Sequence, residues 1–347
     1  MRCVPRLSLL LALILLLAPA TPVSVESAGI DSKPAHHLAS GFRNLDDGYH
    51  YDVGVRMEHF FSDAFSRHLP RGTPLTVVAN NGAALRANRS EPTLTWIGHS
   101  TFLVQLDGVN ILTDPIWANR ASPVSFAGPR RLVPAGLDFA DLPPIDAVVI
   151  SHDHYDHLDV ATVERLAREH HPRFFVPLGL RAWLKERGIT DVVELDWWQR
   201  AEFRGLTLVC TPAQHSSGRT LADQYLRLWS SWVVLGPTKR FFFAGDTGYD
   251  PRLRSIGERL GPFDFTAIPI GGYDTFPTGH PNHLNPEEAV QLFEDIHGRL
   301  LVPMHWGTFA MNREPFHEPP DRLLREAQRR GIDKQIAILN PGQTIAW

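Results

Sequence analysis

The segment 151–159, which reads SHDHYDHLD, limits what this chain can fold into more than any other feature of the sequence. It follows the apolar run 147–150, which predicts a buried strand, and it places three histidines and two aspartates within six consecutive positions. Imidazole nitrogen and carboxylate oxygen are good ligands for divalent transition metals, and zinc is the usual metal in such mixed sites. A His-rich polar loop without a metal is the alternative, but the spacing H-x-H-x-D-H after a strand favours a metal-binding loop.

Three further residues complete a candidate ligand set, and each follows an apolar run that predicts a strand. They are His215 after the run 206–210, Asp246 after the run 241–244 and His305 after the run 300–303. Strand ends suit metal ligands because a rigid sheet holds each side chain with little positional error. Seven ligands are too many for one tetrahedral ion and suit two ions that share a bridge.

A two-metal arrangement divides the seven residues into two groups and a bridge. One ion would be held by His152, His154 and His215, the other by Asp156, His157 and His305, with Asp246 as the bridge. Such a pair lowers the pKa of bound water to about 7, and the resulting centre attracts an anionic phosphodiester. The sequence therefore predicts hydrolysis of an ester-like bond by a metal-bridged hydroxide, with Asp156 and Asp246 as candidate catalytic residues.

Composition excludes several other function classes. The 347 residues can bury a large core, and 43% hydrophobic and 21% charged residues are ordinary for a globular protein. A formal net charge of −4 gives no reason to expect a nucleic-acid partner. The sequence lacks a Walker-type phosphate loop, and neither Ser100 nor Ser151 lies in a nucleophile elbow, so a serine hydrolase is not expected.

The first 20 residues have the layout of a secretory signal peptide. Two arginines precede the apolar run 9–17, and an A-x-A-like cleavage site follows at 18–20. We therefore predict cleavage near residues 20–28 and a secreted or periplasmic protein, with an uncleaved N-terminal anchor as the alternative. Removal of the signal would leave Cys210 without a partner for an intrachain disulfide.

The remaining chain divides into a short N-terminal segment and a large domain. Residues 21–45 predict a linker or an arm on the domain surface, with His36 and His37 in solvent. Residues 46–347 predict a single hydrolase domain with an α/β fold, in which two sheets pack face to face under covering helices. This architecture follows because helices and strands alternate and because each candidate ligand lies just past a strand.

The pattern of apolar residues and turn residues predicts the individual elements. A turn at Asp107-Gly108 should join two strands, Asp159 should cap a helix, and Asn285-Pro286 should begin another. Strands are expected at 94–97, 101–106, 109–112, 147–150, 174–176, 191–194, 206–210, 231–235, 240–244, 265–268, 300–303 and 335–339, and helices near 57–68, 160–170, 180–187, 286–297 and 321–330.

The metal motif resembles that of the metallo-β-lactamase superfamily. The flanking segments resemble, within it, the N-acyl-phosphatidylethanolamine-hydrolysing phospholipase D family. The segments that point to this family are ELDWW (194–198), FFFAGDTGY (241–249) and HWGTFA (305–310), and further similar segments run in order through most of residues 95–320. The N-terminal 45 residues lie outside this resemblance.

The resemblance implies a four-layer αββα sandwich, two zinc ions, and cleavage of a phospholipid to phosphatidic acid and an N-acylethanolamine. It also implies that Tyr155 and His283 contact the lipid, and it makes peripheral membrane association an expectation. Two alternatives stay open. The same centre could hydrolyse a lactone, another small ester or a soluble phosphodiester, or the chain could be a periplasmic metal-binding protein without turnover.

Several residues near the motif have two interpretations each. His99 is expected to be a turn or core residue beside the site rather than a ligand. Asp114 could orient a ligand histidine or serve only a turn, and His283 could contact substrate or lie in a surface loop. Core packing, rather than a lipid channel, is expected for Trp197, Trp198, Trp229 and Trp232.

Overall fold

The computed structural model describes residues 25–26, 34–46, 71–273, 281–311 and 314–347. The predicted signal peptide and the predicted helix at 57–68 lie outside these residues. In the part that is described, no helix combines the length and the apolar character that crossing a membrane requires.

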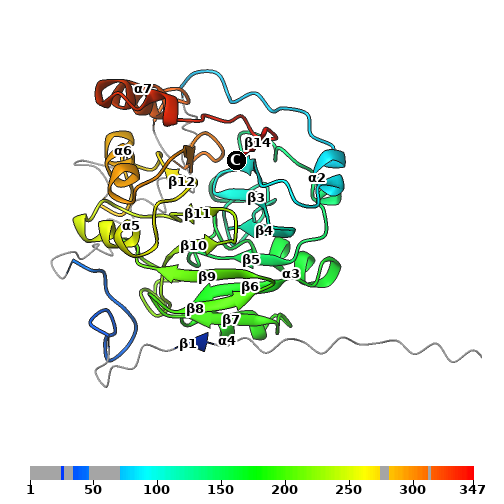
Figure 1. Cartoon of the computed structure of the whole chain (residues 1–347). Coiled ribbons are helices and arrows are strands. Elements are labelled where there is room, and N and C mark those ends of the chain that lie inside the picture. Colours follow the sequence, from blue (N-terminus) through cyan, green and yellow to red (C-terminus); the bar gives the residue numbers. More distant parts are fainter. Residues whose placement is uncertain (1–24, 27–33, 47–70, 274–280, 312–313) are drawn as a thin grey trace, which may run out of the picture.

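The described strands form two seven-stranded sheets, which lie against each other in the middle of the molecule (Figure 1). The first sheet contains, in spatial order, β1 (Val25–Glu26), β8 (Arg200–Phe203), β9 (Leu206–Thr211), β10 (Ser231–Leu235), β11 (Arg240–Phe243), β12 (Phe265–Pro269) and β13 (Leu301–Met304). The second sheet contains β14 (Thr344–Ala346), β2 (Thr93–Gly98), β3 (Thr101–Leu106), β4 (Val109–Thr113), β5 (Ala147–Val149), β6 (Arg173–Pro177) and β7 (Val192–Leu195).

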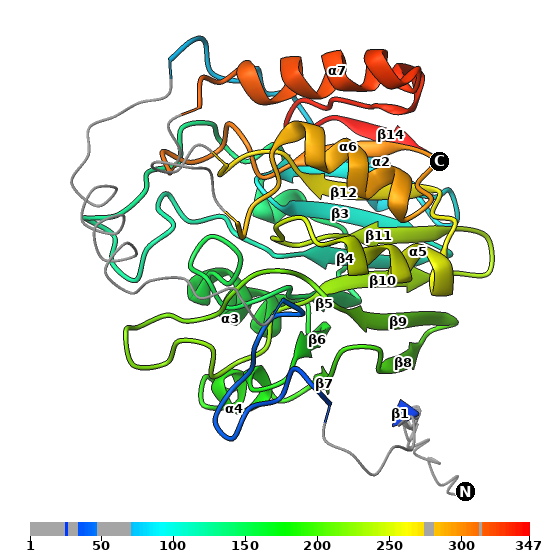
Figure 2. The ribbon, with the colours of Figure 1, turned by 90° about the vertical axis from the view of Figure 1, so that its left-hand side faces the viewer.

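Helices cover the outer face of each sheet, as the views in Figures 1 and 2 show. The first sheet is covered by α5 (Arg254–Leu260), α6 (Pro286–Asp295) and α7 (Glu318–Arg330), and the second by α2 (Ala83–Ala87), α3 (Val160–Glu169) and α4 (Leu180–Lys185). Short 3₁₀ turns lie at Phe139–Asp141, Pro251–Leu253 and Asp333–Gln335. The order helix, sheet, sheet, helix confirms the predicted αββα sandwich.

Large apolar side chains fill the space between the sheets. Trp96, Phe102 and Trp232 are fully buried there, and a second cluster packs Val163 and Leu166 of α3 onto the outer face of the second sheet. Burial of apolar surface of this extent supplies most of the driving force for folding.

The tryptophans that the sequence analysis singled out belong to the core. Trp197, Trp229 and Trp232 are buried, and each indole N–H finds an acceptor, such as the carbonyl of Ile150 at 2.8 Å from Trp232. Trp198 is half-buried against the same core. Core packing is therefore confirmed for the three buried rings.

Parallel pairing brings the ends of several strands to one edge. In the first sheet β11, β12 and β13 run parallel, and in the second sheet β4, β5, β6 and β7 do so. Parallel neighbours end at the same edge of a sheet. The loops that follow β4, β5, β11 and β13 therefore meet where the two sheets face each other.

Most local predictions agree with the structure. Asp107 and Gly108, with φ of 49° and 81°, join β3 and β4 as predicted. Asn285 accepts from the backbone N–H of Glu288 at 2.9 Å and completes a capping box at α6. Asp159 precedes α3, but its carboxylate accepts from Thr162 Oγ1 instead of capping the backbone.

The prediction of a final strand at 335–339 is wrong. A 3₁₀ turn occupies Asp333–Gln335, and Ile336 makes only an isolated bridge to Leu301. The last strand is β14, which pairs antiparallel with β2 of the other sheet. A turn at Gly342, with φ of 92°, redirects the chain between the two sheets, so the apolar run does not extend the first sheet.

Candidate metal centre

The structure brings all seven predicted ligands together at the edge where the loops meet. They come from the loop after β5 (His152, His154, Asp156 and His157), the loop after β9 (His215), the loop after β11 (Asp246) and the loop after β13 (His305). Except for the half-buried His154, all of them are buried. The site therefore combines segments that lie far apart in the sequence.

Three histidines form the first group. Nδ1 of His154 lies 2.9 Å from Nε2 of His152 and 3.2 Å from Nε2 of His215. The three nitrogen atoms all lie within 4.8 Å of one another, and three imidazoles plus a water are a common ligand set for zinc in enzymes.

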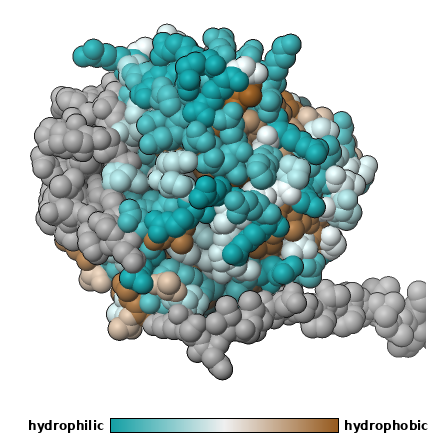
Figure 3. Space-filling view, turned by 60° about the vertical axis from the view of Figure 1, so that its left-hand side comes forward, coloured by the Kyte–Doolittle hydropathy of each residue, from teal (hydrophilic) through white to brown (hydrophobic). Residues whose placement is uncertain are grey.

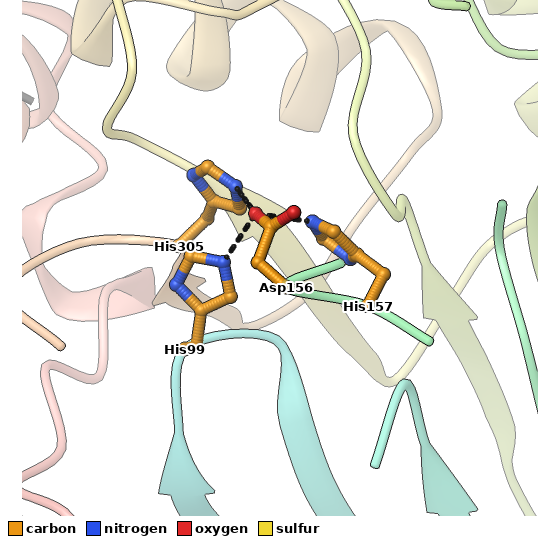
Figure 4. A group of neighbouring side chains, drawn as sticks. All are labelled: His99, Asp156, His157 and His305. Carbon is orange, nitrogen blue, oxygen red and sulfur yellow. Dashed lines mark hydrogen bonds and ion pairs between the residues drawn. The ribbon is translucent and has the colours of Figure 1, made fainter. Parts of the chain in front are cut away.

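One carboxylate and two imidazoles form the second group, which Figure 4 shows together with His99. Oδ2 of Asp156 lies 3.2 Å from Nε2 of His157 and 3.4 Å from Nε2 of His305. Ligands of one tetrahedral zinc ion lie about 3.4 Å apart when the bonds are about 2.1 Å long. These separations therefore suit ligands of a shared ion.

Asp246 lies between the two groups. Its Oδ2 is 3.0 Å from Nε2 of His157, 3.1 Å from Nε2 of His305 and 3.8 Å from Nε2 of His215. Within the described residues, its buried Oδ1 has no hydrogen-bond partner. A buried carboxylate oxygen without a donor is costly unless a cation binds it, so this residue fits the bridging position that the sequence predicts.

The first group is electrostatically suited to bind a cation. Burial, with repulsion from neighbouring imidazoles, holds the pKa of His152 well below its usual value. Burial also lowers the pKa of His215 to about 4. Both side chains are therefore neutral at pH 7, and neutral imidazole is the form that binds metal.

The second group holds excess negative charge. Burial alone would lower the pKa of His305, but the nearby carboxylate of Asp246 raises it to about 9, and the two carboxylates raise the pKa of His157 well above its usual value. Burial opposes ionisation of Asp156 and Asp246, yet the histidines hold the pKa of both carboxyls well below the usual range. Two carboxylates thus demand positive charge, which protons or a divalent cation can supply.

Asp114 orients one of these histidines. It is fully buried, its Oδ2 lies 2.7 Å from Nδ1 of His157, and it accepts from both the backbone N–H and the hydroxyl of Ser151. Burial raises the pKa of this carboxyl, and the contact with His157 opposes that rise. Of the two interpretations of Asp114, the orienting one agrees with the structure.

His99 is buried in the turn between β2 and β3, and it belongs to the same group of possible ligand residues as Asp156, His157 and His305. Its Nε2 lies 2.9 Å from Oδ2 of Asp156, and its ring lies 4.1 Å from that of His305 (Figure 4). Burial and the neighbouring His305 lower its pKa to about 3. A neutral His99 can donate to the carboxylate of Asp156 and fix its orientation.

The two predicted substrate contacts border the centre. The Tyr155 hydroxyl donates to the carbonyl of Arg219 at 2.9 Å, and the Tyr155 ring lines a pocket of about 410 Å³. Nδ1 of His283 lies 3.9 Å from Oδ2 of Asp246, and the side chain is partly exposed. His283 therefore lies against the centre, in a loop that is partly exposed.

The prediction that His36 and His37 are in solvent is also wrong. Nε2 of His36 lies 2.6 Å from Oδ1 of Asp196, and Nε2 of His37 lies 2.7 Å from Oδ2 of the same carboxylate. The ring of His36 also stacks on Trp197, with centroids 4.3 Å apart. Apolar and ionic contacts with the domain thus outweigh solvation of these side chains.

Two asparagines at the centre were missed by sequence reasoning. The carbonyl of Asn282 lies 3.0 Å from Nδ1 of His215, and the side chain of Asn44 pairs with the backbone of His215. A backbone carbonyl leaves no signal in a sequence. Asn44 lies in a short polar stretch that has no motif.

Comparison with known proteins places the chain among metallo-hydrolases. A family model described as a beta-lactamase superfamily domain matches residues 109–306. The chain is 46% identical over 263 residues to N-acyl-phosphatidylethanolamine-hydrolyzing phospholipase D 1 of Caenorhabditis elegans, covering 72% of this chain and 74% of that protein. It is 32% identical over 259 residues to the mitochondrial N-acyl-phosphatidylethanolamine-hydrolyzing phospholipase D of Saccharomyces cerevisiae, covering 72% of this chain and 55% of that protein.

A solved structure shares the fold. The metallo hydrolase from the hyperthermophilic archaeon Ignicoccus hospitalis superposes with a TM-score of 0.58 at 25% identity, covering 74% of this chain and 99% of that chain. The residues that the family model matches include all seven members of the candidate metal centre.

Proposed function

This chain belongs to the metallo-β-lactamase superfamily and is a metal-dependent hydrolase, and from that premise we propose that it cleaves an N-acyl-phosphatidylethanolamine in the manner of a phospholipase D. The products would be phosphatidic acid and an N-acylethanolamine. We propose two zinc ions as the cofactors and the first and second groups, with Asp246 between them, as their ligands.

The position of Asp246 is the observation that carries the metal assignment. One carboxylate within 3.0–3.8 Å of histidines from both groups is what a shared bridge requires. When bound, the ions would lower the pKa of water and stabilise negative charge on the reacting phosphodiester. The similarity to the phospholipase D 1 of C. elegans supports the lipid substrate.

The chain's own residues would orient the ligands. An ionised carboxylate can only accept, so Nδ1 of His157 donates to Asp114 and Nε2 is the ligand atom. The carbonyl of Asn282 imposes the same tautomer on His215. His283, 3.9 Å from Asp246 and partly exposed, would meet the phosphate of the substrate at the mouth of the centre.

Apolar side chains near the centre support a substrate that lies in a lipid surface. Hydrophilic side chains cover most of the face that Figure 3 shows. Against this background, the large apolar side chains that are exposed among the described residues are Leu38, Val78, Val124, Phe126, Leu221 and Leu226.

These side chains gather in one region of the chain. All except Val78 lie on the segments 34–46, 118–130 and 218–227. The backbone N–H of Phe42 bonds the carbonyl of Tyr225, and Val124 lines the same pocket as Tyr155 and Arg219, so these segments adjoin each other and the centre. We propose that this region contacts the membrane that holds the substrate.

The decisive experiment measures phosphatidic acid release from vesicles that contain an N-acyl-phosphatidylethanolamine. The zinc-loaded full chain should release it, and a chelator or Asp246→Asn should abolish release. Loss of a bridging ligand should cost at least the roughly 10- to 100-fold that removal of an outer hydrogen-bond partner costs. Failure of a zinc-loaded preparation to cleave the lipid would reject this substrate.

A panel of a lactone, a small ester and a soluble phosphodiester tests the remaining enzyme alternative. Turnover of one of these compounds, without cleavage of the lipid, would support the proposed metal centre and reject the proposed lipid substrate. Bound zinc without turnover on any ester would instead indicate a metal-binding protein.

We also propose that the N-terminal signal directs the chain out of the cytoplasm. The sequence of the protein recovered outside the cytoplasm should begin near residues 20–28; an intact Met1 there would favour the uncleaved anchor, and a protein found only in the cytoplasm would contradict the proposal.

A further inference from the structure

The segment 34–46 reaches the metal centre through Asn44. The side chain of Asn44 is buried and pairs with both backbone groups of His215: Nδ2 donates to the carbonyl at 2.7 Å, and Oδ1 accepts from the N–H at 2.9 Å. The indole N–H of Trp229 donates to the same Oδ1 at 2.9 Å. One side chain thus makes the two backbone hydrogen bonds that a neighbouring strand would otherwise provide.

His215 needs such a partner because it lies beyond the end of β9, which stops at Thr211. A loop residue has no sheet ladder to fix its peptide groups, and a metal ligand must be held to about 0.5 Å. The contact with Asn282 fixes the imidazole ring, whereas the contacts with Asn44 fix the backbone that carries it. We propose that Asn44 is a positioning residue for His215, so that residues 34–46 complete the metal centre.

The other end of this segment is anchored on Asp196, whose carboxylate receives one imidazole on each oxygen. The anchor also connects to Asn44 through tryptophans. His36 stacks on Trp197, whose indole N–H donates to the carbonyl of Trp229 at 2.7 Å. Trp229 in turn donates to Asn44. Both ends of the segment therefore rest on the same buried tryptophan pair.

Hydrogen bonds made by backbone groups on either side of Asn44 also hold the segment against the domain. The backbone N–H of Phe42 donates to the carbonyl of Tyr225 at 2.8 Å, and the guanidinium of Arg252 donates to the carbonyl of Leu45. Within the segment, the N–H of Arg43 donates to the carbonyl of His36 at 2.9 Å. These contacts leave Asn44 little freedom to leave His215.

Interatomic distances distinguish the anchor from a further metal site. The nitrogen–oxygen separations at Asp196 are 2.6 and 2.7 Å, which is the length of a charge-assisted hydrogen bond. Two ligands of a tetrahedral zinc ion lie about 3.4 Å apart. In the candidate metal centre, Nε2 of His157 and of His305 lies 3.0–3.4 Å from Oδ2 of Asp156 and of Asp246. His36 and His37 therefore bind Asp196 directly.

The inference rests on the proposed ligand role of His215, and its test measures metal binding rather than turnover. Four full-length proteins are compared: wild type, Asn44→Ala, His215→Ala and Asn80→Ala. Asn80 is a matched control because its Nδ2 also donates to a backbone carbonyl, that of Gly342 at 2.8 Å, and its Oδ1 accepts from the N–H of Gly82 at 2.9 Å. The readouts are zinc affinity by chelator competition and the absorption spectrum of the cobalt-substituted protein.

Asn44→Ala should weaken the binding of one of the two zinc ions about 10- to 100-fold and shift the absorption spectrum of the cobalt-substituted protein. Asn80→Ala should retain the wild-type affinity and spectrum. Wild-type affinity and spectrum in Asn44→Ala would overturn the inference. Unchanged zinc affinity in His215→Ala would instead reject the proposed ligand, and these two failures are distinguishable.

If Asn44→Ala does not fold, the double variant His36→Gln/His37→Gln replaces it. Loss of the contacts with Asp196 should weaken the binding of the same zinc ion several-fold and shift the cobalt spectrum in the same direction. Unchanged binding of both ions in this variant would overturn the inference. Loss of a third, separately measured equivalent of zinc would show that the anchor is a metal site and would overturn its assignment as a hydrogen-bonded one.

Discussion

Oδ2 of Asp114 lies 2.7 Å from Nδ1 of His157, and both side chains are fully buried. The aspartate follows β4 and the histidine follows β5, two parallel neighbours of the second sheet. The sheet holds both loops in place, so the carboxylate of Asp114 stays beside Nδ1 of His157. This contact fixes the tautomer and the ring orientation of the histidine.

Asp114→Asn should therefore weaken metal binding about 10- to 100-fold while the fold is retained, because an amide is similar in size but lacks the charge. Zinc affinity by chelator competition measures the effect. Asp107→Asn, at a half-buried position in the turn between β3 and β4, is the control for the same substitution. Equal affinities in the two variants would refute the orienting role.

Metal binding should release protons, because His305 has a pKa raised to about 9 in the metal-free protein. Below that pH the imidazole is protonated and competes with the cation, so zinc affinity should rise with pH through about 9. Calorimetric titration at pH 7.5 in buffers of different ionisation enthalpy measures the protons released. A binding enthalpy that does not depend on the buffer would contradict the prediction.

The same pKa has a consequence for stability. A histidine whose pKa is raised by folding stabilises the protein below its ordinary pKa, and this contribution is lost as the pH rises through the folded value. The metal-free protein should therefore lose stability between about pH 7 and 9 through His305. Urea unfolding of the metal-free protein across this pH range measures the change in the free energy of unfolding. A rise in this free energy with pH would contradict the prediction.

Arg227→Ala should destabilise the protein by about 3–5 kcal/mol, because it removes the guanidinium from the carboxylate of Asp153, which is fully buried. The control is Arg165→Ala, whose pair with Glu169 is exposed and should contribute little to stability. Urea unfolding of the zinc-loaded proteins gives the two values. Similar losses for both variants would show that burial of Asp153 does not matter.

Phe126→Ser and Val124→Ser should slow cleavage of lipid in vesicles but not of the same lipid in detergent micelles. Phe126 is 81% exposed, and transfer of such a side chain into a membrane is worth about 1.5–3 kcal/mol, or about tenfold or more in binding. Val78→Ser is matched to Val124→Ser, because the two valines are 39% and 38% exposed. Equal rates on vesicles for both valine variants would place the membrane contact elsewhere.

The sequence predicted the convergence of the seven candidate ligands because the signal is local. Four of the seven residues lie within six positions, and the other three each follow a strand of a parallel or mixed sheet. Strand ends converge at a sheet edge, so the position of His215, Asp246 and His305 along the chain was enough to predict their proximity.

The N-terminal contribution could not be predicted in this way. Asn44 and His215 are 171 positions apart, and His36 and Asp196 are 160 positions apart. The N-terminal member of each pair, Asn44 or His36, lies in no periodic pattern or motif, and polar residues near a terminus ordinarily suggest a solvated segment. Only the packing of His36 on Trp197 and the burial of Asn44 reveal these contacts.

The sequence pattern also could not predict the short helices or the pairing of strands that lie far apart in the chain. Helices α2 and α5 span five and seven residues, which is too short for an apolar period to be recognised. β14 pairs with β2, whose sequence lies near the other end of the domain, and no local feature selects that partner over β13.

The pairing of β14 with β2 and the contact of Asn44 with His215 bear on how this protein can be shortened. The boundaries of the family match, residues 109–306, invite a minimal version of the gene. Such a version would encode all seven candidate metal ligands and yet omit β2, β3 and β14 of the second sheet and the amide that supports His215. A shortened protein should therefore keep the residues on both sides of 109–306. The segment that contains the metal motif is shorter than the segment that is needed to fold and position it.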